Sequence, residues 1–539
     1  MPFWAIFLIF VCYCSITLSI PSLVLYDHFA TRFPDQDNVF SRILYYLVIF
    51  LYQVFFLWVL LLHRWWFRIM AIILVVLGAI HYTFTNYYGV CVDQDMIHNI
   101  LNTNVHEVTE LFTPGLIWNI IIFALPAVVL LLLVRITPVS GWRWWVGVLM
   151  TPVLSFLLLI VILYGLPSNI KDVIFSVKGQ INCTLFPANS IVGSIRNIRD
   201  WQERRAIERT PRAPIDAAAT IRSEDSQLPL LVVLVIGETA RAKNYSLNGY
   251  ERETNPLLRS EDIINYPHAS SCGTYTLLSV PCIFSPKANP ESYKRNNLFS
   301  QENALQFWQR LGISVQWVAN NSIIPALMKD IPNQKVSSKL YQTSACIRNA
   351  CYDEVFVEDL TKRLSQSLPK RHSLLVYHLL GNHFAYESRV PKNFKYFTPI
   401  CKPDKFSSCS PQEILNSYDN AIRYNDYVLA QLIATLRSHD NKTQSILLYT
   451  SDHGESLGER GIWFHGLPYS IAPKEQTHVP LMFWMSKSFR SKKPQRYQCL
   501  KEKSSTLQVS HEFIFHTLVT IFSIATKRYS KPHDLLASC

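Results

Sequence analysis

Five long apolar stretches occupy the first third of the chain and predict membrane-spanning helices. A helix crosses a bilayer in about 20 residues, and each stretch has roughly that length. No basic region precedes the first stretch and further spans follow it, so we do not expect a cleaved signal peptide. The predicted spans are residues 3–25, 43–62, 66–84, 116–134 and 144–165.

From about residue 227, short apolar runs alternate with longer amphipathic segments. Short apolar runs are typical of buried strands, and the longer segments are typical of helices. Their alternation predicts an α/β domain in which helices cover both faces of a mostly parallel sheet. We expect strands at 230–236, 313–318, 373–379, 446–450 and 479–485, and helices at 301–311, 353–367 and 411–437.

Two further segments have an amphipathic pattern. The loop 93–112 predicts a helix that lies at the outer membrane interface or packs on the soluble domain. Its counterpart Ile191–Arg209 predicts a basic helix that rests on anionic headgroups. We therefore divide the chain into a transmembrane domain (1–165), a connector (166–226) and a catalytic domain (227–539).

The charges predict how the chain is oriented. The second and fourth turns between spans carry Arg64, Arg68, Arg135 and Arg143, whereas the loop 85–115 carries acids and no Lys or Arg. By the positive-inside rule those two turns are cytoplasmic, and everything after the fifth span is outside. Of the net charge of +12, residues 1–165 contribute −1 and the remainder +13. A basic outward domain suits anionic lipids or substrates and makes nucleic acid an unsuitable partner.

The cysteines agree with an exported domain. Short, loop-closing pairs are typical of disulfides in an oxidising compartment. Free thiols and zinc ligands are the alternatives, but the chain has no CxxC motif. Cys12 and Cys14 fall in the first span as apolar residues, and Cys91, Cys183, Cys499 and Cys539 cannot be paired from the sequence. The predicted disulfides are Cys272–Cys282, Cys346–Cys351 and Cys401–Cys409.

Acidic signatures follow two of the predicted strands. Glu238 comes directly after the run 230–236, and Asp452 and His453 follow 446–450. In open α/β sheets, ligands bind at the carboxyl ends of the strands. Carboxylate and imidazole groups gathered there predict a metal site.

A small loop closed by Cys272 and Cys282 holds two threonines. Covalent phosphoryl transfer needs a nucleophile that is deprotonated near neutral pH, and a hydroxyl bound to zinc meets that need. A helix that starts near Thr276 would also help to hold an anionic phosphate. On spacing alone either Thr274 or Thr276 could be the nucleophile, and both could be purely structural.

Together these segments resemble the phosphoethanolamine transferases of Gram-negative inner membranes. That family includes the mobile colistin-resistance enzymes and belongs to the alkaline phosphatase and sulfatase superfamily. The resemblance extends over nearly the whole chain. The segments that carry it are VVLVIGETAR, NGYERETNP, SCGTYTLLSVPC, GNH, SYDNAIRYNDYVL, SDHGESLGERG and APKEQTHVP.

The resemblance implies a role for each of eight residues. It implies that Thr276 is the nucleophile and is transiently phosphorylated. It also implies that Zn²⁺ is bound by Glu238, Thr276, Asp452 and His453. His383 and His465 correspond to residues that bind a second metal or the phosphoryl group, and His378 and Asn321 to residues near the substrate.

The chain departs from the family pattern at two places. Pro325 stands where many relatives have a lysine, and Phe384-Ala385 replaces the Gly-Pro that usually follows GNH. The departures concern the predicted headgroup contacts and leave the predicted metal ligands intact.

The function implied is transfer of phosphoethanolamine from phosphatidylethanolamine to lipid A or the lipopolysaccharide core, which would lower susceptibility to polymyxin. We expect a monomer in the inner membrane with its catalytic domain in the periplasm. The alternative is a phosphoglycerol transferase or phosphatase of the same superfamily. A sulfatase is disfavoured because its modified Cys or Ser motif is absent, and a binding protein with a degenerate site is disfavoured because the four predicted ligands are present.

Overall fold

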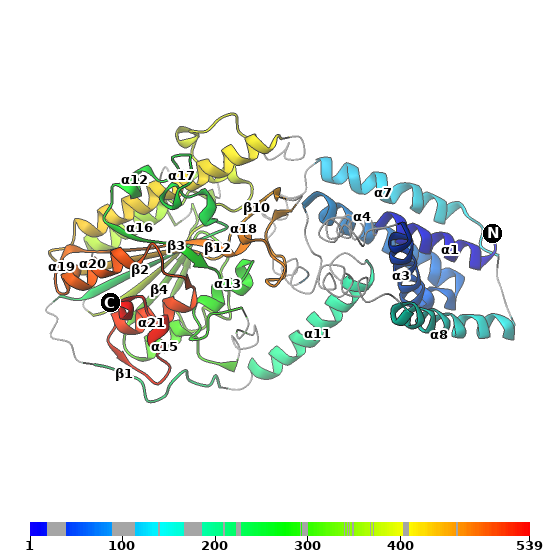
Figure 1. The fold of residues 1–539 in the computed structure, drawn as a ribbon, viewed down its shortest axis with the longest axis horizontal. Helices are drawn as coiled ribbons and strands as arrows, with labels where there is room; N and C mark the ends of the chain where they lie inside the picture. Colours follow the sequence, from blue (N-terminus) through cyan, green and yellow to red (C-terminus); the bar gives the residue numbers. More distant parts are fainter. Residues whose placement is uncertain are drawn as a thin grey trace. The chain divides into compact units, whose positions relative to one another are not determined.

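The computed structural model divides into two compact units, drawn in Figure 1, each with its own hydrophobic core. The first comprises Met1–Arg199 and Gly461–Trp463, and the second comprises Asp200–Arg460 and Phe464–Cys539. The residues that the structure describes are 1–18, 39–88, 97, 114–137, 141–165, 186–208, 211–222, 228–290, 293, 300–338, 340–341, 343, 345–347, 350–366, 368–369, 371–402, 409–459 and 462–539.

Apolar helices build the first unit. They are α1 (Phe3–Tyr13, continued as a π-helix over Cys14–Leu18), α3 (Val39–Leu57, continued as a 3₁₀ segment over Trp58–Leu62), α4 (Arg64–Tyr88), α7 (Pro114–Leu133) and α8 (Trp142–Gly165). Within the described residues, four segments are long and apolar enough to cross a membrane: Ile43–Leu62, Arg64–Thr85, Pro114–Leu133 and Trp144–Ile162.

The predicted count of five spans is therefore not supported. The first predicted span, 3–25, contains an apolar helix that is shorter than a bilayer requires, Phe3–Ile16. Its last residues fall in 19–38, which lie outside the described residues. The other four predicted spans agree with the observed helices to within a few residues.

Packing in the first unit leaves much apolar surface uncovered. Phe7, Phe67 and Val75 form part of its core and are fully buried. By contrast, Leu133 on α7 is 76% exposed and Leu149 on α8 is 60% exposed. Such a continuous apolar surface is unfavourable in water and suits contact with lipid.

A long helix occupies the predicted basic amphipathic segment. It is α11 (Ala188–Glu208), and it runs through the residues where the two units divide. Ile195 and Ile198 on this helix are more than half exposed. The other amphipathic prediction, 93–112, lies outside the described residues except for Ile97.

An eight-stranded mixed sheet forms the centre of the second unit. Its strand order is β13-β3-β12-β9-β2-β8-β4-β5. Strand β12 runs antiparallel to both of its neighbours, and the other adjacent pairs are parallel. The expected mostly parallel sheet is thus a mixed one, because β12 reverses direction. The strands are β2 (Leu230–Gly237), β3 (Ile263–Ser270), β4 (Ser314–Ala319), β5 (Asn333–Lys335), β8 (Ser373–His378), β9 (Gln444–Ser451), β12 (His478–Met485) and β13 (Val509–Ser510).

The central strands are buried on both faces, which explains their continuous apolar sequence. All eight residues of β2 are buried. Figure 1 shows α16 (Val355–Gln366) and α17 (Pro411–Arg437) over one face of the sheet, and α15 (Ala304–Arg310) and α21 (Glu512–Ile521) over the other. On the second face Val232 and Leu234 share a core with Trp308 and Phe515.

Shorter elements complete the second unit. They are the helices α12 (Pro256–Arg259), α13 (Thr276–Ile283), α18 (Lys474–Thr477), α19 (Lys487–Arg490) and α20 (Pro494–Lys503), and the two-residue strands β1 (Thr220–Ile221), β6 (Cys346–Ile347), β7 (Ala350–Cys351), β10 (Ser456–Leu457), β11 (Trp463–Phe464) and β14 (Ile524–Ala525).

Disulfides close several of its loops. The three predicted pairs, Cys272–Cys282, Cys346–Cys351 and Cys401–Cys409, are all present. A fourth disulfide joins Cys499 to Cys539 across 40 residues of sequence. Sequence spacing did not reveal it, since only the fold brings α20 and the end of the chain together.

Candidate active site

The site begins where strands β2 and β9 end side by side. These strands are parallel, with Gly237 opposite Ser451. Glu238 and Asp452 therefore leave the sheet at the same edge, and the Asp452 N–H donates to the carbonyl of Gly237 at 3.0 Å. Because parallel strands share a carboxyl edge, two acids far apart in sequence become neighbours.

Thr276, the first residue of α13, lies directly beside this pair. Its Oγ1 is 3.1 Å from each carboxylate oxygen of Glu238 and 3.4 Å from Nε2 of His453. The other threonine of the loop, Thr274, instead donates to the carbonyl of Leu467 at 2.7 Å. Of the two threonines that the sequence left open, only Thr276 contacts the acidic cluster.

The cluster is strongly charged and shielded from solvent. Glu238, Asp452 and His453 are each fully buried. His453 Nε2 lies 3.2 Å from Glu238 Oε1 and 3.3 Å from Asp452 Oδ2. Two carboxylates in such a small volume repel each other unless a positive charge sits between them.

The pKa values reflect this crowding. Burial, followed by repulsion from Glu238, raises the pKa of Asp452 well above its ordinary value. Burial also opposes ionisation of Glu238, but the imidazoles of His378 and His453 outweigh it and hold the pKa of Glu238 well below its usual range. The pKa of His453 rises to about 9, because attraction by Asp452 and Glu238 overcomes its burial.

The three residues could hold a metal ion. One ligand atom from each of Glu238, Asp452 and His453 lies within 4.8 Å of the others. Asp452 Oδ2 is buried and has no hydrogen-bond partner in the described structure. An unsatisfied buried carboxylate oxygen is costly, and a bound cation would remove that cost. Carboxylate oxygen and imidazole nitrogen are ligands that suit Zn²⁺.

Two further predicted residues adjoin Glu238. Asn321 donates from Nδ2 to Glu238 Oε2 at 2.6 Å. His378, at the end of β8, is fully buried, and its Nε2 lies 3.8 Å from the same oxygen. Both residues therefore adjoin a carboxylate oxygen that also lies 3.1 Å from the Thr276 hydroxyl.

The remaining predicted histidines, His383 and His465, form a second group next to the first. The ring of His465 is 4.3 Å from that of His453 and 6.3 Å from that of His383, measured between centroids. His383 Nδ1 is bonded to the carbonyl of Phe384 at 2.7 Å. Burial, followed by repulsion from His453, lowers the pKa of His465 and keeps its ring largely neutral.

Sequence reasoning missed several residues that hold the site in place. Glu455 accepts from Nδ1 of His465 and from the hydroxyl of Tyr386, each at 2.7 Å. Tyr418 on α17 donates to the carbonyl of Thr239 at 2.6 Å and so fixes the loop that carries Glu238. Glu455 and Tyr418 lie in two of the segments that carry the family resemblance, but sequence reasoning assigned them no role, because each acts through a contact distant in sequence.

The two departures from the family pattern lie at different depths. Phe384 is buried, and its ring packs edge-to-face against Tyr386 and Phe464. Pro325 is exposed in the loop that follows β4. The first change is thus part of the packing behind His383, whereas the second is at the surface.

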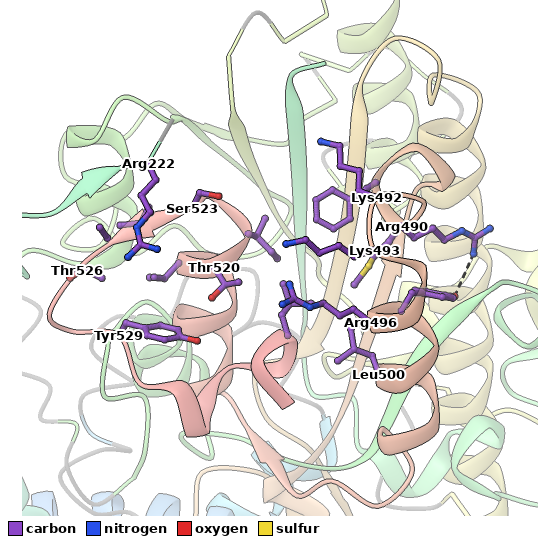
Figure 2. Close-up of a pocket in the computed structure, with 18 residues that line it drawn as sticks. Arg222, Arg490, Lys492, Lys493, Arg496, Leu500, Thr520, Ser523, Thr526 and Tyr529 are labelled. Atoms are coloured by element: carbon purple, nitrogen blue, oxygen red, sulfur yellow. Dashed lines mark hydrogen bonds between the residues drawn. The ribbon is translucent and has the colours of Figure 1, made fainter. Parts of the chain in front are cut away.

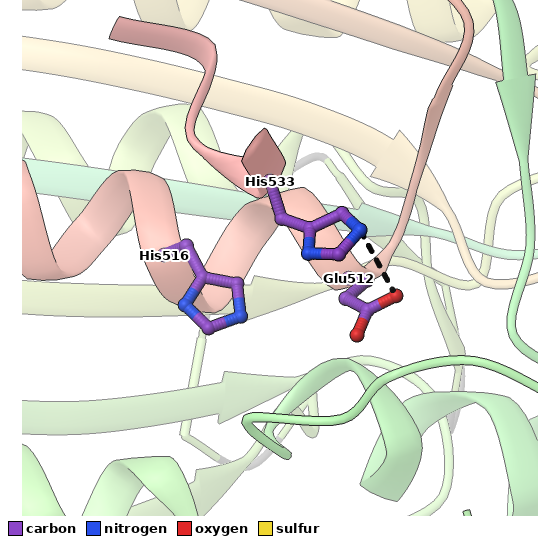
Figure 3. A group of neighbouring side chains, drawn as sticks. All are labelled: Glu512, His516 and His533. Carbon is purple, nitrogen blue, oxygen red and sulfur yellow. Dashed lines mark ion pairs between the residues drawn. The ribbon is translucent and has the colours of Figure 1, made fainter. Parts of the chain in front are cut away.

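A second group of potential metal ligands lies elsewhere in the unit, as Figure 3 shows. It consists of Glu512, His516 and His533, with His533 Nε2 3.7 Å from Glu512 Oε2. His516 already uses both ring nitrogens, since Nδ1 accepts from the Ser530 N–H and Nε2 donates to the carbonyl of Pro286, each at 3.1 Å. This arrangement is that of a structural histidine joining α21 to the C-terminal segment.

Comparison with known proteins places this site in context. A family model described as "Sulfatase" matches residues 231–524, and one described as "Phosphoethanolamine transferase EptA/EptB" matches residues 48–201. The first match covers more than half of the chain, and the second covers most of the apolar helices.

Similar proteins match over almost the full length. The phosphoethanolamine transferase EptA of Salmonella typhimurium is 35% identical over 88% of this chain and 86% of its own. The phosphatidylethanolamine transferase Mcr-1 of Escherichia coli is 32% identical over 94% and 93%. The structure is similar to that of the integral membrane protein EptA, a lipooligosaccharide phosphoethanolamine transferase from Neisseria meningitidis, with a TM-score of 0.88, 28% identity and coverage of 99% and 98%.

Proposed function

This chain belongs to the phosphoethanolamine transferase family, and on that premise we propose that it transfers phosphoethanolamine from phosphatidylethanolamine to lipid A or to the lipopolysaccharide core. The observation that carries the proposal is the hydroxyl of Thr276, held 3.1 Å from both oxygens of Glu238 at the start of α13. A relative from Escherichia coli that is named Kdo(2)-lipid A phosphoethanolamine 7''-transferase supports the choice of acceptor. The likeness to Mcr-1 supports reduced polymyxin susceptibility as the outcome.

Zn²⁺ is the cofactor that we propose, held by Glu238, Asp452, His453 and the oxygen of Thr276. The unsatisfied Asp452 Oδ2 and the ligand atoms gathered within 4.8 Å support this assignment. When bound, Zn²⁺ would lower the pKa of the threonine hydroxyl and offset negative charge on the phosphoryl oxygens.

In the proposed reaction the side chains carry out two displacements. Thr276 Oγ1 gives up its proton and forms a bond to phosphorus, while the bond to diacylglycerol breaks and the released oxygen takes up a proton. A phosphate oxygen or sugar hydroxyl of the acceptor then gives up its proton and bonds to the same phosphorus, while the bond between Thr276 Oγ1 and phosphorus breaks and Oγ1 takes up a proton. His383 and His465 bind the phosphoryl oxygens or a second metal, and Glu455 holds His465 so that Nε2 faces the reaction.

Asn321 and His378 have supporting roles in this scheme. Asn321 orients Glu238 through its 2.6 Å hydrogen bond, and His378 borders the same carboxylate. Substitution of a residue that orients a metal ligand in this way commonly lowers metal affinity or activity by about 10- to 100-fold. Both residues also remain candidates for contact with the phosphoethanolamine group.

We further infer an integral inner-membrane protein, acting as a monomer, whose second unit faces the periplasm. The four apolar segments of membrane-spanning length and the disulfides of the second unit support this location. We assign residues 1–165 to the membrane, 166–226 to the connector and 227–539 to catalysis.

The test uses membranes that contain the full-length protein and fluorescent phosphatidylethanolamine. The native protein should release labelled diacylglycerol and carry a phosphoethanolamine adduct on Thr276. Thr276→Ala should reduce release by at least about a thousandfold, because the nucleophile is absent. Thr274→Ala is the matched control and should retain most of the activity.

The products decide between the possible outcomes. A mass increase of one phosphoethanolamine on the cell's lipid A supports the proposal. Diacylglycerol release unaffected by Thr276→Ala would overturn it. Free phosphoethanolamine as the only end product would show a phosphatase, and transfer of phosphoglycerol would show the alternative transferase.

A further inference from the structure

A groove of about 540 Å³ lies at the opposite end of the sheet from Thr276. Strand β12 connects the two ends: Leu481 pairs with Thr450 near the active site, and Met485, which lines the groove, pairs with Ile446. Asp452 follows Ile446 by six residues along β9 and its end, which at about 3.4 Å per residue separates the two places by roughly 20 Å. The groove is thus distinct from the proposed active site.

Basic side chains line this groove from two directions. Arg490, Lys492, Lys493 and Arg496 come from α19, α20 and the turn between them, and Arg222 comes from the segment after β1. None of the 18 residues that line the groove is Asp or Glu. Two acids, Asp534 and Asp216, lie behind the wall that carries Thr520, Thr526 and Tyr529. Five lining cations exceed them, so the net charge around the cavity is positive.

Most of this charge is not neutralised within the described part of the chain. Arg490 forms an ion pair with Asp262, which is outside the groove and is also paired with Lys501. Arg222, Lys493 and Arg496 make no ion pair among the described residues. Lys493 is exposed and Arg496 half-buried, so both are accessible to a ligand.

Hydroxyl groups and an apolar floor complete the groove. Figure 2 shows Lys493 and Arg496 extending from one wall toward the wall that carries Thr520 and Tyr529. The hydroxyls of this second wall are already used within the protein, since Thr520 and Tyr529 both donate to Asp534 and Thr526 donates to Asp216. Recognition of an anion in the groove therefore falls to the arginine and lysine side chains. The apolar lining residues between the walls are Met485, Phe489, Leu500, Val519, Ile521, Ile524, Ala525 and Leu536.

We propose that this groove binds a phosphomonoester group, whose charge is net negative, carried on an amphiphilic molecule. Arginine and lysine side chains recognise phosphate oxygens, and a cationic substituent on the phosphate, as in phosphatidylcholine, would cancel the attraction. A site for inorganic phosphate alone would not need a floor of Phe489, Leu500 and Ile524, nor a cavity of this size. The volume lies in the range of pockets for small organic ligands, and the apolar lining would cover the non-polar part of such a ligand.

The proposal does not depend on the transferase activity. The groove shares no residue with the proposed catalytic or metal-binding set. Variants of the groove should therefore leave phosphoethanolamine transfer with a soluble, short-chain donor unchanged. Failure of the transferase proposal would equally leave binding in the groove intact.

The test measures binding to the full-length protein in nanodiscs of zwitterionic lipid. The probes are dihexanoyl phosphatidic acid, dihexanoyl phosphatidylcholine and inorganic phosphate, each titrated by calorimetry at two salt concentrations. The double variant Lys493→Gln/Arg496→Gln removes two groove cations. The matched control is Lys487→Gln/Lys503→Gln. It also removes two cations, one from α19 and one from α20, and neither of these lysines lines the groove.

We expect phosphatidic acid to bind the native protein at least about tenfold more tightly than inorganic phosphate, since burial of each methylene adds affinity. The groove variant should weaken this binding by about tenfold or more, with a smaller salt dependence, and the control should not. Equal affinity for phosphatidic acid and phosphatidylcholine would overturn the proposal. Equal affinity for phosphatidic acid and inorganic phosphate would also overturn it. A groove variant that unfolds at the same temperature as the native protein and binds phosphatidic acid with the same affinity would overturn it as well.

Discussion

At the scale of single residues, the carboxylate of Glu238 connects the parts of the site. Both of its oxygens lie 3.1 Å from the hydroxyl of Thr276, Oε2 also accepts from the amide of Asn321, and Oε1 lies 3.2 Å from Nε2 of His453. Because the carboxylate has only two oxygens, each neighbour limits where the others can sit. The direction in which Glu238 points therefore sets the position of Thr276, the proposed nucleophile.

Asn321→Ala should test this dependence. Loss of the 2.6 Å hydrogen bond leaves Glu238 less well oriented. We expect zinc affinity and transferase activity to fall by about 10- to 100-fold, whereas the thermal unfolding midpoint changes little. Metal content after dialysis and the rate of diacylglycerol release measure the two effects.

The neighbouring residue provides the control. The Asn320 side chain donates to Asp353 and to the carbonyl of Cys351, and its hydrogen bonds in the described part of the chain do not include Glu238. Asn320→Ala should therefore affect stability and leave metal affinity unchanged. Equal metal affinity in the Asn321 and Asn320 variants would contradict the orienting role of Asn321.

Gly454 follows the two predicted metal ligands and permits a close backbone contact. A Cβ atom at this position would lie 2.1 Å from the carbonyl oxygen of Glu475. Gly454→Ala must therefore displace the backbone beside Asp452 and His453. We expect a loss of about 3 kcal/mol in the free energy of unfolding and a fall in activity of about a hundredfold.

Gly249→Ala separates this clash from ordinary backbone strain. Gly249 has a φ of 92°, but a Cβ atom added there would meet no other atom within 4 Å. The substitution should cost only about 1 kcal/mol, with activity retained. Chemical denaturation and transferase assays compare the two variants, and similar losses in both would refute the proposed clash.

At the scale of elements, the nucleophile loop is joined to the end of β9 by one buried histidine. His511 Nδ1 accepts from the Cys272 N–H at 3.1 Å, and its Nε2 donates to the carbonyl of Ser451 at 3.0 Å. The residue thus holds the segment that leads to Thr276 against the segment that leads to Asp452. Two elements that must meet for catalysis are connected through a third.

This histidine should make stability depend on pH. Burial lowers the pKa of His511 to about 3 in the folded protein, compared with about 6.5 in the unfolded chain. Below pH 6.5 the unfolded chain takes up a proton that the folded protein does not. The contribution of neutral His511 to the free energy of unfolding is therefore fully present above pH 6.5. It falls by up to about 1.4 kcal/mol per pH unit as the pH decreases toward 3.

His511→Asn should remove that part of the pH dependence. At pH 7 the variant should be less stable by about 2 kcal/mol, since a buried hydrogen bond is lost. The difference from the native protein should then shrink as the pH falls below 6.5. Thermal unfolding across this range measures it, with the exposed His268→Asn as control; a constant difference at every pH would disprove the assignment.

At the scale of the whole molecule, the two units differ in composition as they do in structure. The first exposes apolar side chains along α7 and α8, and the second buries its apolar residues in a sheet core closed by disulfides. Lipid can cover the first surface, and an oxidising compartment maintains the disulfides. Both conditions are met by a protein anchored in the inner membrane with its second unit outside the cytoplasm.

Protease accessibility tests this orientation. In intact spheroplasts, added protease should remove the second unit and leave a fragment of the first in the membrane. In inside-out vesicles the second unit should survive. A cytoplasmic protein serves as the control for intact spheroplasts, and the reverse pattern of cleavage would exclude a periplasmic active site.

The sequence by itself determined the elements and the chemistry of the strand ends. Periodicity is a local property, so β2, β4, β8, β9 and β12 and the helices α15, α16 and α17 could be predicted, whereas β3 and α21 were not. Glu238 and Asp452 were recognised from their places after buried runs. The reversed direction of β12 could not be predicted, because direction in a sheet depends on how distant segments connect.

Only the tertiary structure decided which distant groups meet. It placed Thr276 rather than Thr274 against Glu238, joined Glu455 to His465, and brought Cys499 to Cys539. It also gathered the basic groove from segments after β1 and around α20. These contacts depend on sheet order and on packing between elements far apart in the chain, and no local pattern of residues encodes them.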